Sequence, residues 1–229
     1  MPHGQPDEIK LLPAYPLAVA ARFVGSNSST LRAWFRGRSY PVGGKLRQSA
    51  AVLTTRSVTG EPISFIDLVE AHVLTLVRRC YNFPMKNFKA AAETLAKLKG
   101  DLTYLAHKDF YADHKNLFLE IDGKLISLSE RGQHVDRKII SKGLMQLSYG
   151  DDGFASRFYP VIRQTEQRDV FLDPEINFGR PCLASLGVGT EAMAARFFAG
   201  ETISELAEDY GATAQQVETA VRWHDLRAA

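Results

Sequence analysis

The segment Leu17–Arg38, which reads LAVAARFVGSNSSTLRAWFRGR, decides the fold that the sequence predicts. Its first part carries four apolar residues at helical spacing, namely Leu17, Ala20, Ala21 and Val24. This stripe predicts a short helix with one buried face, and its alanines allow a neighbouring helix to approach closely.

A second helix is predicted directly after the first. Gly25 stands where a left-handed residue would end the first helix, and Asn27 is a favourable N-cap for a helix that runs to about Gly37. Three apolar side chains of this second helix would face the first one: Leu31, Trp34 and Phe35. Two short helices joined by a tight turn are typical of helix-turn-helix domains that bind DNA.

The outer face of the second helix would then carry Ser28, Ser29, Arg32 and Arg36. Hydroxyls and backbone amides at a helix N-terminus suit phosphates, while arginines reach either phosphates or guanine edges, and the sequence does not separate these two roles. Residues 1–50 carry seven Lys and Arg against two acidic residues, a net charge of +5, whereas the whole chain is only +2. This focused charge favours DNA binding over a plain helical hairpin with solvated arginines, which is the structural alternative.

The composition is that of an ordinary globular protein. With 229 residues, of which 45% are hydrophobic and 24% charged, the chain can form two to three small domains with real cores. No apolar run approaches the length of a membrane span and the N-terminus has no signal-peptide pattern, so we expect a cytoplasmic protein that does not contact membranes. The two cysteines, Cys80 and Cys182, are predicted to be buried thiols.

The segment that follows the helix-turn-helix is predicted to be a wing or connector up to about residue 62 and helical after it. Ser64 would cap a long helix to Cys80 with a continuous apolar stripe, and Met85–Lys99 would form the next helix, closed by Gly100. The long helix is our candidate for a dimer face. His72 lies within its apolar stripe and is therefore expected to be a hydrogen-bonded core residue rather than a ligand or base.

The middle of the chain predicts a small β element. Residues 116–121 and 124–128 flank Asp122-Gly123, a dipeptide that suits a tight hairpin turn. Three more elements are expected: a helix at about 132–147 and strands at 154–162 and 170–172.

The last part predicts three helices, at 190–199, 202–210 and 213–223, and Thr202 with Glu205 has the spacing of a capping box. From Ala184 onward seven acidic residues face three arginines, a net charge of −4. Such a surface repels phosphates, so this unit is expected to bind protein rather than DNA.

These elements predict an α+β fold, mainly α, in which a helix-turn-helix and its following helices precede a small central β element and a C-terminal three-helix unit. We divide the chain into a DNA-binding domain at 1–100, an α+β scaffold with the hairpin at 101–165 and a trihelical domain at 166–229.

The same residues carry a family resemblance. LAVAARFVGSNSSTLRAWFRG resembles the first helix-turn-helix of MerR-type regulators, and ISFIDLVEAHVLTLVRRCYNFPMKNFKAAAETLAKL is similar to the helices that follow it in VapB-like antitoxins. The C-terminal stretch FLDPEINFGRPCLASLGVGTEAMAARFFAGETISELAEDYGATAQQVETAVRW resembles a small bacterial domain of formerly unknown function that such antitoxins carry. Together these stretches cover most of the chain and resemble a type II antitoxin.

The resemblance implies two partners, and a homodimer is expected because operator sites are usually bound by two-fold symmetric proteins. VapB-like proteins bind and silence a cognate VapC-type toxin, a PIN-domain ribonuclease, and the complex represses its own operator DNA. The matching motif transfers five candidate DNA contacts, and Ser28, Arg38 and Lys45 complete the predicted DNA-binding set: Ser28, Ser29, Thr30, Arg32, Trp34, Arg36, Arg38 and Lys45. Toxin-binding residues stay unassigned. The chain departs from the family pattern at one turn, where Ser185-Leu186-Gly187 replaces Gly-Thr-Arg. The alternative function is a stand-alone MerR-like regulator without a toxin partner.

An enzyme is not expected. His107 and His114 flank Asp109 and Asp113, but their spacing matches no short metal-ligand pattern. Gly187-Val188-Gly189 precedes a helix without the rest of a dinucleotide fingerprint. We therefore predict no catalytic residue, no metal and no cofactor.

Overall fold

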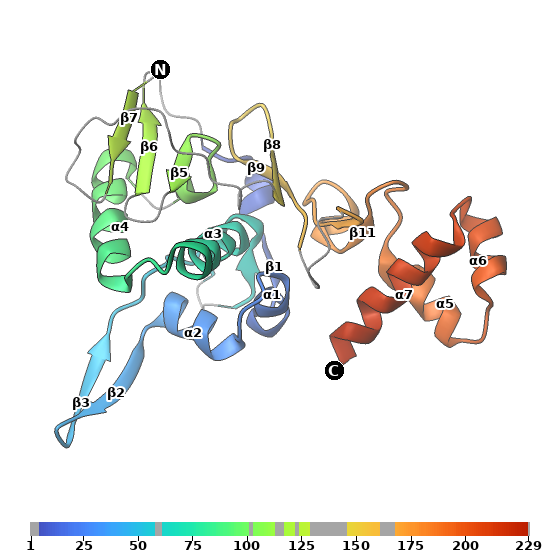
Figure 1. Ribbon diagram of the computed structural model, residues 1–229, viewed down its shortest axis with the longest axis horizontal. Coiled ribbons are helices and arrows are strands. Elements are labelled where there is room, and N and C mark those ends of the chain that lie inside the picture. The colour runs from blue at the N-terminus through green and yellow to red at the C-terminus, as the bar shows by residue number, and fades with distance from the viewer. Residues whose placement is uncertain are drawn as a thin grey trace. The chain divides into compact units, whose positions relative to one another are not determined.

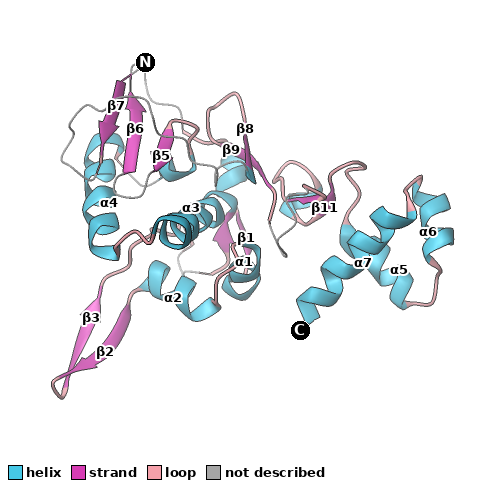
Figure 2. Ribbon diagram, in the orientation of Figure 1, coloured by secondary structure: helices cyan, strands magenta, loops and turns pink. Residues whose placement is uncertain are grey.

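The computed structural model describes residues 5–57, 61–100, 103–112, 117–121, 124–128, 146–160 and 168–228. These residues form two compact units, which we call unit 1 (Met1–Ser156) and unit 2 (Arg157–Ala229). Helix predominates, and the strands form only small sheets of two or three members (Figures 1 and 2). The predicted α+β, mainly α class is confirmed. The division at about residues 100 and 165 stays a prediction.

The helix-turn-helix is confirmed. Helix α1 (Leu17–Phe23) and helix α2 (Ser28–Arg36) are joined by a turn in which Gly25 has a φ of +66°. The Asn27 side chain accepts a hydrogen bond from the Thr30 backbone amide at 2.7 Å and so caps α2. Before α1 lie the short helix η1 (Glu8–Leu11) and the strand β1 (Pro13–Tyr15), which pairs antiparallel with β4 (Ile63–Ser64).

The segment after α2 is a β-hairpin of β2 (Arg38–Val42) and β3 (Lys45–Ser49), which we call the wing. Almost all of its residues are exposed, and Figure 1 shows it projecting from the rest of unit 1. Gly43 and Gly44 have φ of +56° and +76°, as the tight turn between twisted strands requires.

Helices α3 (Phe65–Tyr81) and α4 (Met85–Lys99) form where the sequence predicts them. Residues 65–75 of α3 are all buried, which makes this helix the centre of the core of unit 1. His72 is among them, at 3% exposure, as expected of a core residue. Because these first three turns of α3 are covered by its own unit, the expectation that this helix forms a dimer face is wrong.

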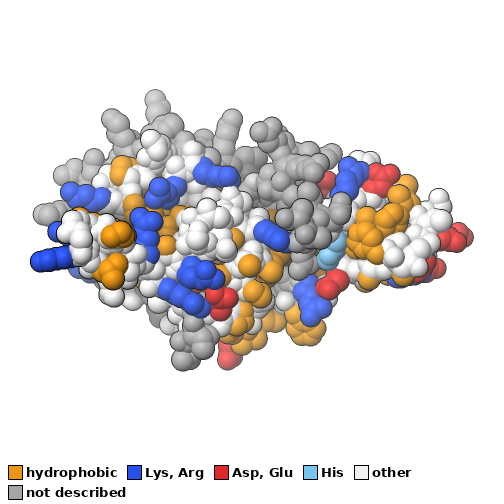
Figure 3. Space-filling view, turned by 90° about the horizontal axis from the view of Figure 1, so that it is seen from below, with side chains coloured by type: hydrophobic (Ala, Val, Ile, Leu, Met, Phe, Trp, Pro, Cys, Tyr) orange, Lys and Arg blue, Asp and Glu red, His pale blue; other side chains and the backbone are white. Residues whose placement is uncertain are grey.

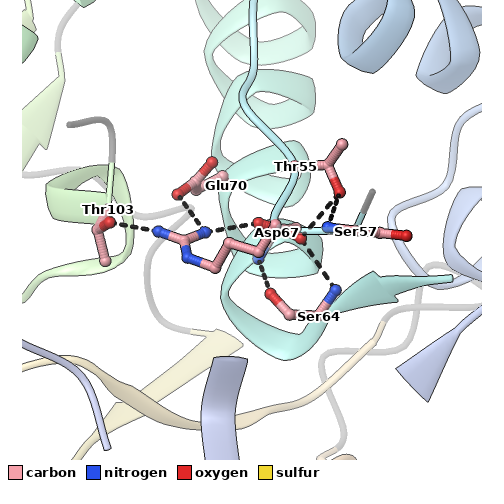
Figure 4. A network of polar contacts seen from close by, with 7 residues as sticks. Thr55, Ser57, Ser64, Asp67, Glu70 and Thr103 are labelled. Carbon is pink, nitrogen blue, oxygen red and sulfur yellow. Dashed lines mark hydrogen bonds and ion pairs between the residues drawn. The ribbon is translucent and has the colours of Figure 1, made fainter. Parts of the chain in front are cut away.

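A polar network fastens the chain after the wing to the start of α3 (Figure 4). Asp67 is fully buried, accepts a hydrogen bond from the Ser64 backbone amide at 3.0 Å and completes the capping box of α3. The Arg56 guanidinium lies 2.6 Å from the same carboxylate and 2.5 Å from Thr103 Oγ1, in helix η2 (Thr103–Ala106). Arg56 therefore points into unit 1, where it links the segment after the wing to α3 and η2.

The central hairpin is also confirmed. Strands β5 (Phe110–Ala112), β6 (Leu117–Ile121) and β7 (Lys124–Ser127) form an antiparallel sheet in that order. Strands β8 (Leu147–Tyr149) and β9 (Ala155–Phe158) pair nearby in the sequence, and β9 is shorter than the predicted strand at 154–162. The helix predicted at about 132–147 falls mostly on residues outside the described part of the chain.

Unit 2 begins with strands and ends with three helices. Strands β10 (Val170–Phe171) and β11 (Cys182–Leu183) pair antiparallel, with helix η4 (Asn177–Gly179) between them. Helices α5 (Thr190–Phe198), α6 (Ile203–Tyr210) and α7 (Ala214–Ala228) follow, and the capping box of Thr202 and Glu205 is present on α6.

The core of unit 2 is apolar and includes a cysteine. Each of the three helices contributes buried apolar side chains that are at most 6% exposed: Met193 of α5, Leu206 of α6, and Val217 and Trp223 of α7. Cys182 is fully buried, as predicted, and burial raises the pKa of its thiol. The Cys80 side chain lies outside the described residues. Among the helices that the structure describes, none combines the length and the apolar character needed to cross a membrane.

Candidate nucleic-acid interface

Helix α2 presents most of the predicted DNA contacts on one side. Ser29, Arg32 and Arg36 are exposed, and Ser28 and Thr30 are half-buried. The guanidinium groups of Arg32 and Arg36 lie 3.9 Å and 3.2 Å from the Glu61 carboxylate. Because exposed ion pairs contribute only about 0–1 kcal/mol, both arginines can exchange this carboxylate for a phosphate at little cost.

Trp34 is placed differently from the other members of the predicted set. Its side chain is only 7% exposed and packs between the helices, as its position opposite Arg32 requires. Its backbone carbonyl accepts hydrogen bonds from the amides of Val52 and Leu53 at 2.7 Å and 3.0 Å. The Trp34 side chain thus lies on the buried side of α2, and its backbone carbonyl fixes the segment that follows the wing.

A groove of about 950 Å³ opens beside α2. Its walls come from the turn and first half of α2, the base of the wing, the end of α3 and the start of α4. Five of the lining residues are basic and none is acidic: Arg32, Arg38, Arg78, Arg79 and Lys89. We call this concavity the basic groove. Figure 3 shows Lys and Arg side chains spread over the face of unit 1 that carries α2 and the wing.

Three of these basic residues were not in the predicted set. Arg78 and Arg79 lie in the last turn of α3, and Lys89 lies in the second turn of α4. A Cβ atom on Gly25 would lie 3.0 Å from the Arg79 guanidinium, so Arg79 reaches over the turn between α1 and α2. Lys89 Nζ donates a hydrogen bond to Ser49 Oγ at 3.2 Å, at the base of the wing. The sequence did contain one indication of this basic surface, because two adjacent arginines follow the apolar stripe of the long helix.

The wing carries the remaining predicted contacts. Arg38 of β2 and Lys45 of β3 are exposed, as is Arg47 of β3. Arg38 also lies over the Tyr40 ring, 5.7 Å from its centroid, an arrangement that leaves the cation accessible. The structure therefore places every basic member of the predicted set on the surface of α2 or of the wing.

Two of the four residues considered for catalysis, His107 and Asp109, lie in the described part of the chain. His107 is nearly buried against Phe154, with ring centroids 4.8 Å apart, and its Nδ1 lies 3.2 Å from the Asp109 carboxylate. Burial lowers the pKa of His107 below its usual range, and Asp109 opposes this shift. Asp113 and His114 lie outside the described residues, and within them no group of three potential metal ligands occurs.

At the glycine-flanked turn before α5, the Thr190 backbone amide already has a hydrogen-bond partner within the protein. The Thr190 amide donates to the Pro181 carbonyl at 2.9 Å, and Gly187 has a φ of +68°. Ser185, which stands in the departure from the family turn, accepts a hydrogen bond from Gln216 of α7 at 2.5 Å. This turn therefore anchors α7 in unit 2.

The two units carry opposite charge. Unit 1 has 21 Lys and Arg against 15 acidic residues, whereas unit 2 has seven arginines and no lysine against 11 acidic residues. Their net charges are +6 and −4. On α5, Arg196 is paired with Glu201 and Asp209, and the net charge of −4 remains after its positive charge is counted.

Two stretches of the chain match known protein families. Residues 13–92 match a family described as "Putative DNA-binding HTH domain", a range that spans α1, α2, the wing, α3 and the first half of α4. Residues 170–223 match a family described as "Protein of unknown function (DUF433)", which spans the strands and helices of unit 2. The two matches fall on different units, the first on unit 1 and the second on unit 2.

One curated relative and one solved structure extend over nearly the whole chain. "Putative antitoxin VapB45" of Mycobacterium tuberculosis (strain ATCC 25618 / H37Rv) is 29% identical over 228 residues, which cover 92% of this chain and 93% of that protein. The crystal structure of Rv2018 from Mycobacterium tuberculosis shares the fold, with a TM-score of 0.60 and 24% identity over 92% of this chain and 98% of that one. The resemblance to VapB-like antitoxins with a helix-turn-helix is confirmed.

Proposed function

We propose that the protein is the antitoxin of a type II toxin-antitoxin system, which binds a cognate VapC-type ribonuclease and represses its own operator. The observation that carries this proposal is the division of charge: a basic groove beside a helix-turn-helix in one unit, and an acidic three-helix unit that follows it. The similarity to an antitoxin along 92% of the chain supports the same function.

The DNA-binding half of the proposal assigns α2 to the major groove. Arg32 and Arg36 would reach bases or phosphates, and Ser28, Ser29 and Thr30 would bind a phosphate near the helix start. The basic groove and the wing would follow the backbone on either side. A homodimer would place two copies of α2 on a symmetric operator.

DNA binding is tested with the upstream region of the gene by fluorescence anisotropy at two salt concentrations. Arg32→Ala with Arg36→Ala, and separately Arg78→Ala with Arg79→Ala, should each weaken binding at least tenfold. Each lost phosphate contact should also reduce the slope of log affinity against log salt by about 0.9. Unchanged affinity of both double variants would refute this half of the proposal.

A matched pair of lysines on α4 serves as control. Lys89 lines the basic groove, whereas Lys97 lies two turns further along the helix and is not among the lining residues. Lys89→Ala should reduce DNA affinity and its salt slope. Lys97→Ala should change neither, because a lysine outside the groove contributes only to the general field of unit 1.

Toxin binding is tested by co-expressing the chain with the product of the adjacent reading frame. We expect a stable complex with a PIN-domain ribonuclease and loss of its cleavage of RNA when the antitoxin is in excess. Light scattering of the free chain and of the complex measures the dimer and the stoichiometry. Specific DNA binding without any ribonuclease partner would instead identify a stand-alone MerR-like regulator.

A further inference from the structure

Unit 2 displays an aromatic side chain that belongs to no core. Phe178, in η4, is 85% exposed, the highest exposure among the large hydrophobic residues that the structure describes. An exposed phenylalanine ring contributes little hydrophobic stabilisation to the folded state. Its exposure therefore indicates a role in binding rather than in stability.

The backbone at this position is strained. Asn177, Phe178 and Gly179 have φ of +51°, +55° and +74°, three consecutive left-handed residues. A Cβ atom makes this conformation unfavourable, and it is rare for a bulky aromatic residue such as Phe178. Such strain persists only where the surrounding structure enforces it.

Asp173 enforces this conformation from inside unit 2. Its carboxylate accepts two hydrogen bonds from Arg157, at 3.0 Å and 3.1 Å, and one from the Glu175 amide at 3.0 Å. Its backbone carbonyl accepts the amides of Ile176 and Gly179, each at 3.0 Å. Asp173 thus accepts five hydrogen bonds, three at its buried carboxylate and two at its backbone carbonyl, and so fixes both ends of the short turn that carries the aromatic ring.

The other flank of the turn is fixed by a close approach. A Cβ atom on Gly189 would come within 2.7 Å of Asn177 Nδ2, so the Asn177 side chain could not keep this position beside a larger residue. The Arg180 amide donates to the Asn177 carbonyl at 3.0 Å. Phe178 therefore stands on a rigid base and loses little conformational entropy when a partner covers it.

The surroundings of Phe178 select the kind of partner. Arg180 is exposed and lies 3.6 Å from the equally exposed Glu191, and Glu175 is exposed nearby in the sequence. Aromatic residues and arginine are both enriched at protein–protein interfaces. The net charge of −4 on unit 2 disfavours stacking of the ring on a nucleic-acid base and favours a protein pocket rimmed by Lys and Arg.

We propose that Phe178 is the anchor by which unit 2 binds its toxin, and that its ring enters an apolar pocket with a basic rim. This inference rests on the proposed function, because the toxin is the partner to which it commits. It adds the residue that carries the affinity and the chemistry of the surface that receives it.

The test uses the full chain and the purified toxin, with the dissociation constant measured by titration calorimetry. Phe178→Gly is the decisive variant, because glycine accepts the left-handed backbone and so removes the ring without harming the fold. We expect at least a 30-fold loss of toxin affinity and a melting temperature no lower than that of the wild type. Phe198→Ala, which removes the next most exposed phenylalanine of unit 2 at 61%, should change affinity less than threefold.

The outcomes separate this inference from the proposed function. If the wild type binds the toxin and Phe178→Gly binds it equally well, the anchor is refuted and the antitoxin function stands. If Phe178→Gly loses operator DNA and keeps the toxin, the ring is a nucleic-acid contact and the anchor is again refuted. If the wild type does not bind the toxin, both fall together.

Discussion

Gly37 shows how much of the DNA-binding geometry depends on a single residue. Its φ of +73° and ψ of −177° belong to a region that essentially only glycine occupies, and a Cβ atom there would lie 2.3 Å from the Ser49 carbonyl oxygen. The turn from α2 into the wing is therefore possible only without a side chain. We expect Gly37→Ala to lower the free energy of unfolding by about 2–4 kcal/mol, measured by chemical denaturation.

Gly43, at the tip of the wing, is the matched control. It also has a positive φ, of +56°, but a Cβ atom there would meet nothing within 4 Å. Gly43→Ala should cost only about 1 kcal/mol, the ordinary penalty of a left-handed alanine. Equal losses for the two variants would show that the close approach to Ser49 contributes nothing.

His107 predicts a pH dependence of stability. Burial lowers its pKa in the folded state below the usual value of 6.5, and Lys108 and Lys99 add to the shift while Asp109 and Asp152 oppose it. The unfolded chain therefore binds the proton more tightly, so stability decreases as the pH falls through about 6.5 and decreases further until the folded state is also protonated. His107→Gln should make the fall in unfolding free energy between pH 7.5 and 5.5 shallower. Identical slopes for both proteins would exclude His107 as its source.

At the scale of the element, the capping boxes show why helix starts were predictable. Thr202 accepts the Glu205 amide at 3.2 Å, and the Glu205 carboxylate accepts the Thr202 amide at 2.8 Å. These backbone and side-chain hydrogen bonds from Thr202 lower the pKa of Glu205. Thr202→Ala should raise that pKa toward its ordinary value, as an NMR titration of the Glu205 side chain would show. Thr213→Ala, at the start of α7, should leave it unchanged.

Elements with local signals were therefore predicted well. Caps, stop glycines and apolar spacing indicated the two helices of the helix-turn-helix, the long α3 and the three helices of unit 2, and all of them form. The stop at Gly25 and the cap at Asn27 act within a few residues, so one stretch of sequence contains the whole cause.

Features that depend on distant residues were not predicted. Arg79 reaches the turn at Gly25, and Lys89 reaches Ser49, only because α3 and α4 pack beside the helix-turn-helix. Nothing near Phe178 in the sequence indicates its exposure, since Asp173 and Gly189 fix that turn from strands and loops on either side. The predicted dimer face on α3 failed for the same reason, because an apolar stripe does not tell which neighbour covers it.

At the scale of the whole molecule, the two compact units have separate cores and net charges of opposite sign. Each unit is thus suited to one partner, the basic unit to a polyanion and the acidic unit to a basic protein surface. The same division explains how a chain with a net charge of only +2 can present a DNA-binding face.

This division predicts that the two binding functions can be removed separately. Arg78→Ala with Arg79→Ala should weaken operator binding at least tenfold and leave toxin affinity within twofold, while Phe178→Gly should do the reverse. Added salt should weaken both complexes, but the DNA complex more steeply, because each phosphate contact releases condensed counterions and a protein pocket does not. Anisotropy with operator DNA and calorimetry with toxin, each at 50 and 200 mM NaCl, measure all four affinities for each protein. A variant of one unit that weakened both complexes equally would contradict this prediction. It would show that the two units do not bind their partners independently.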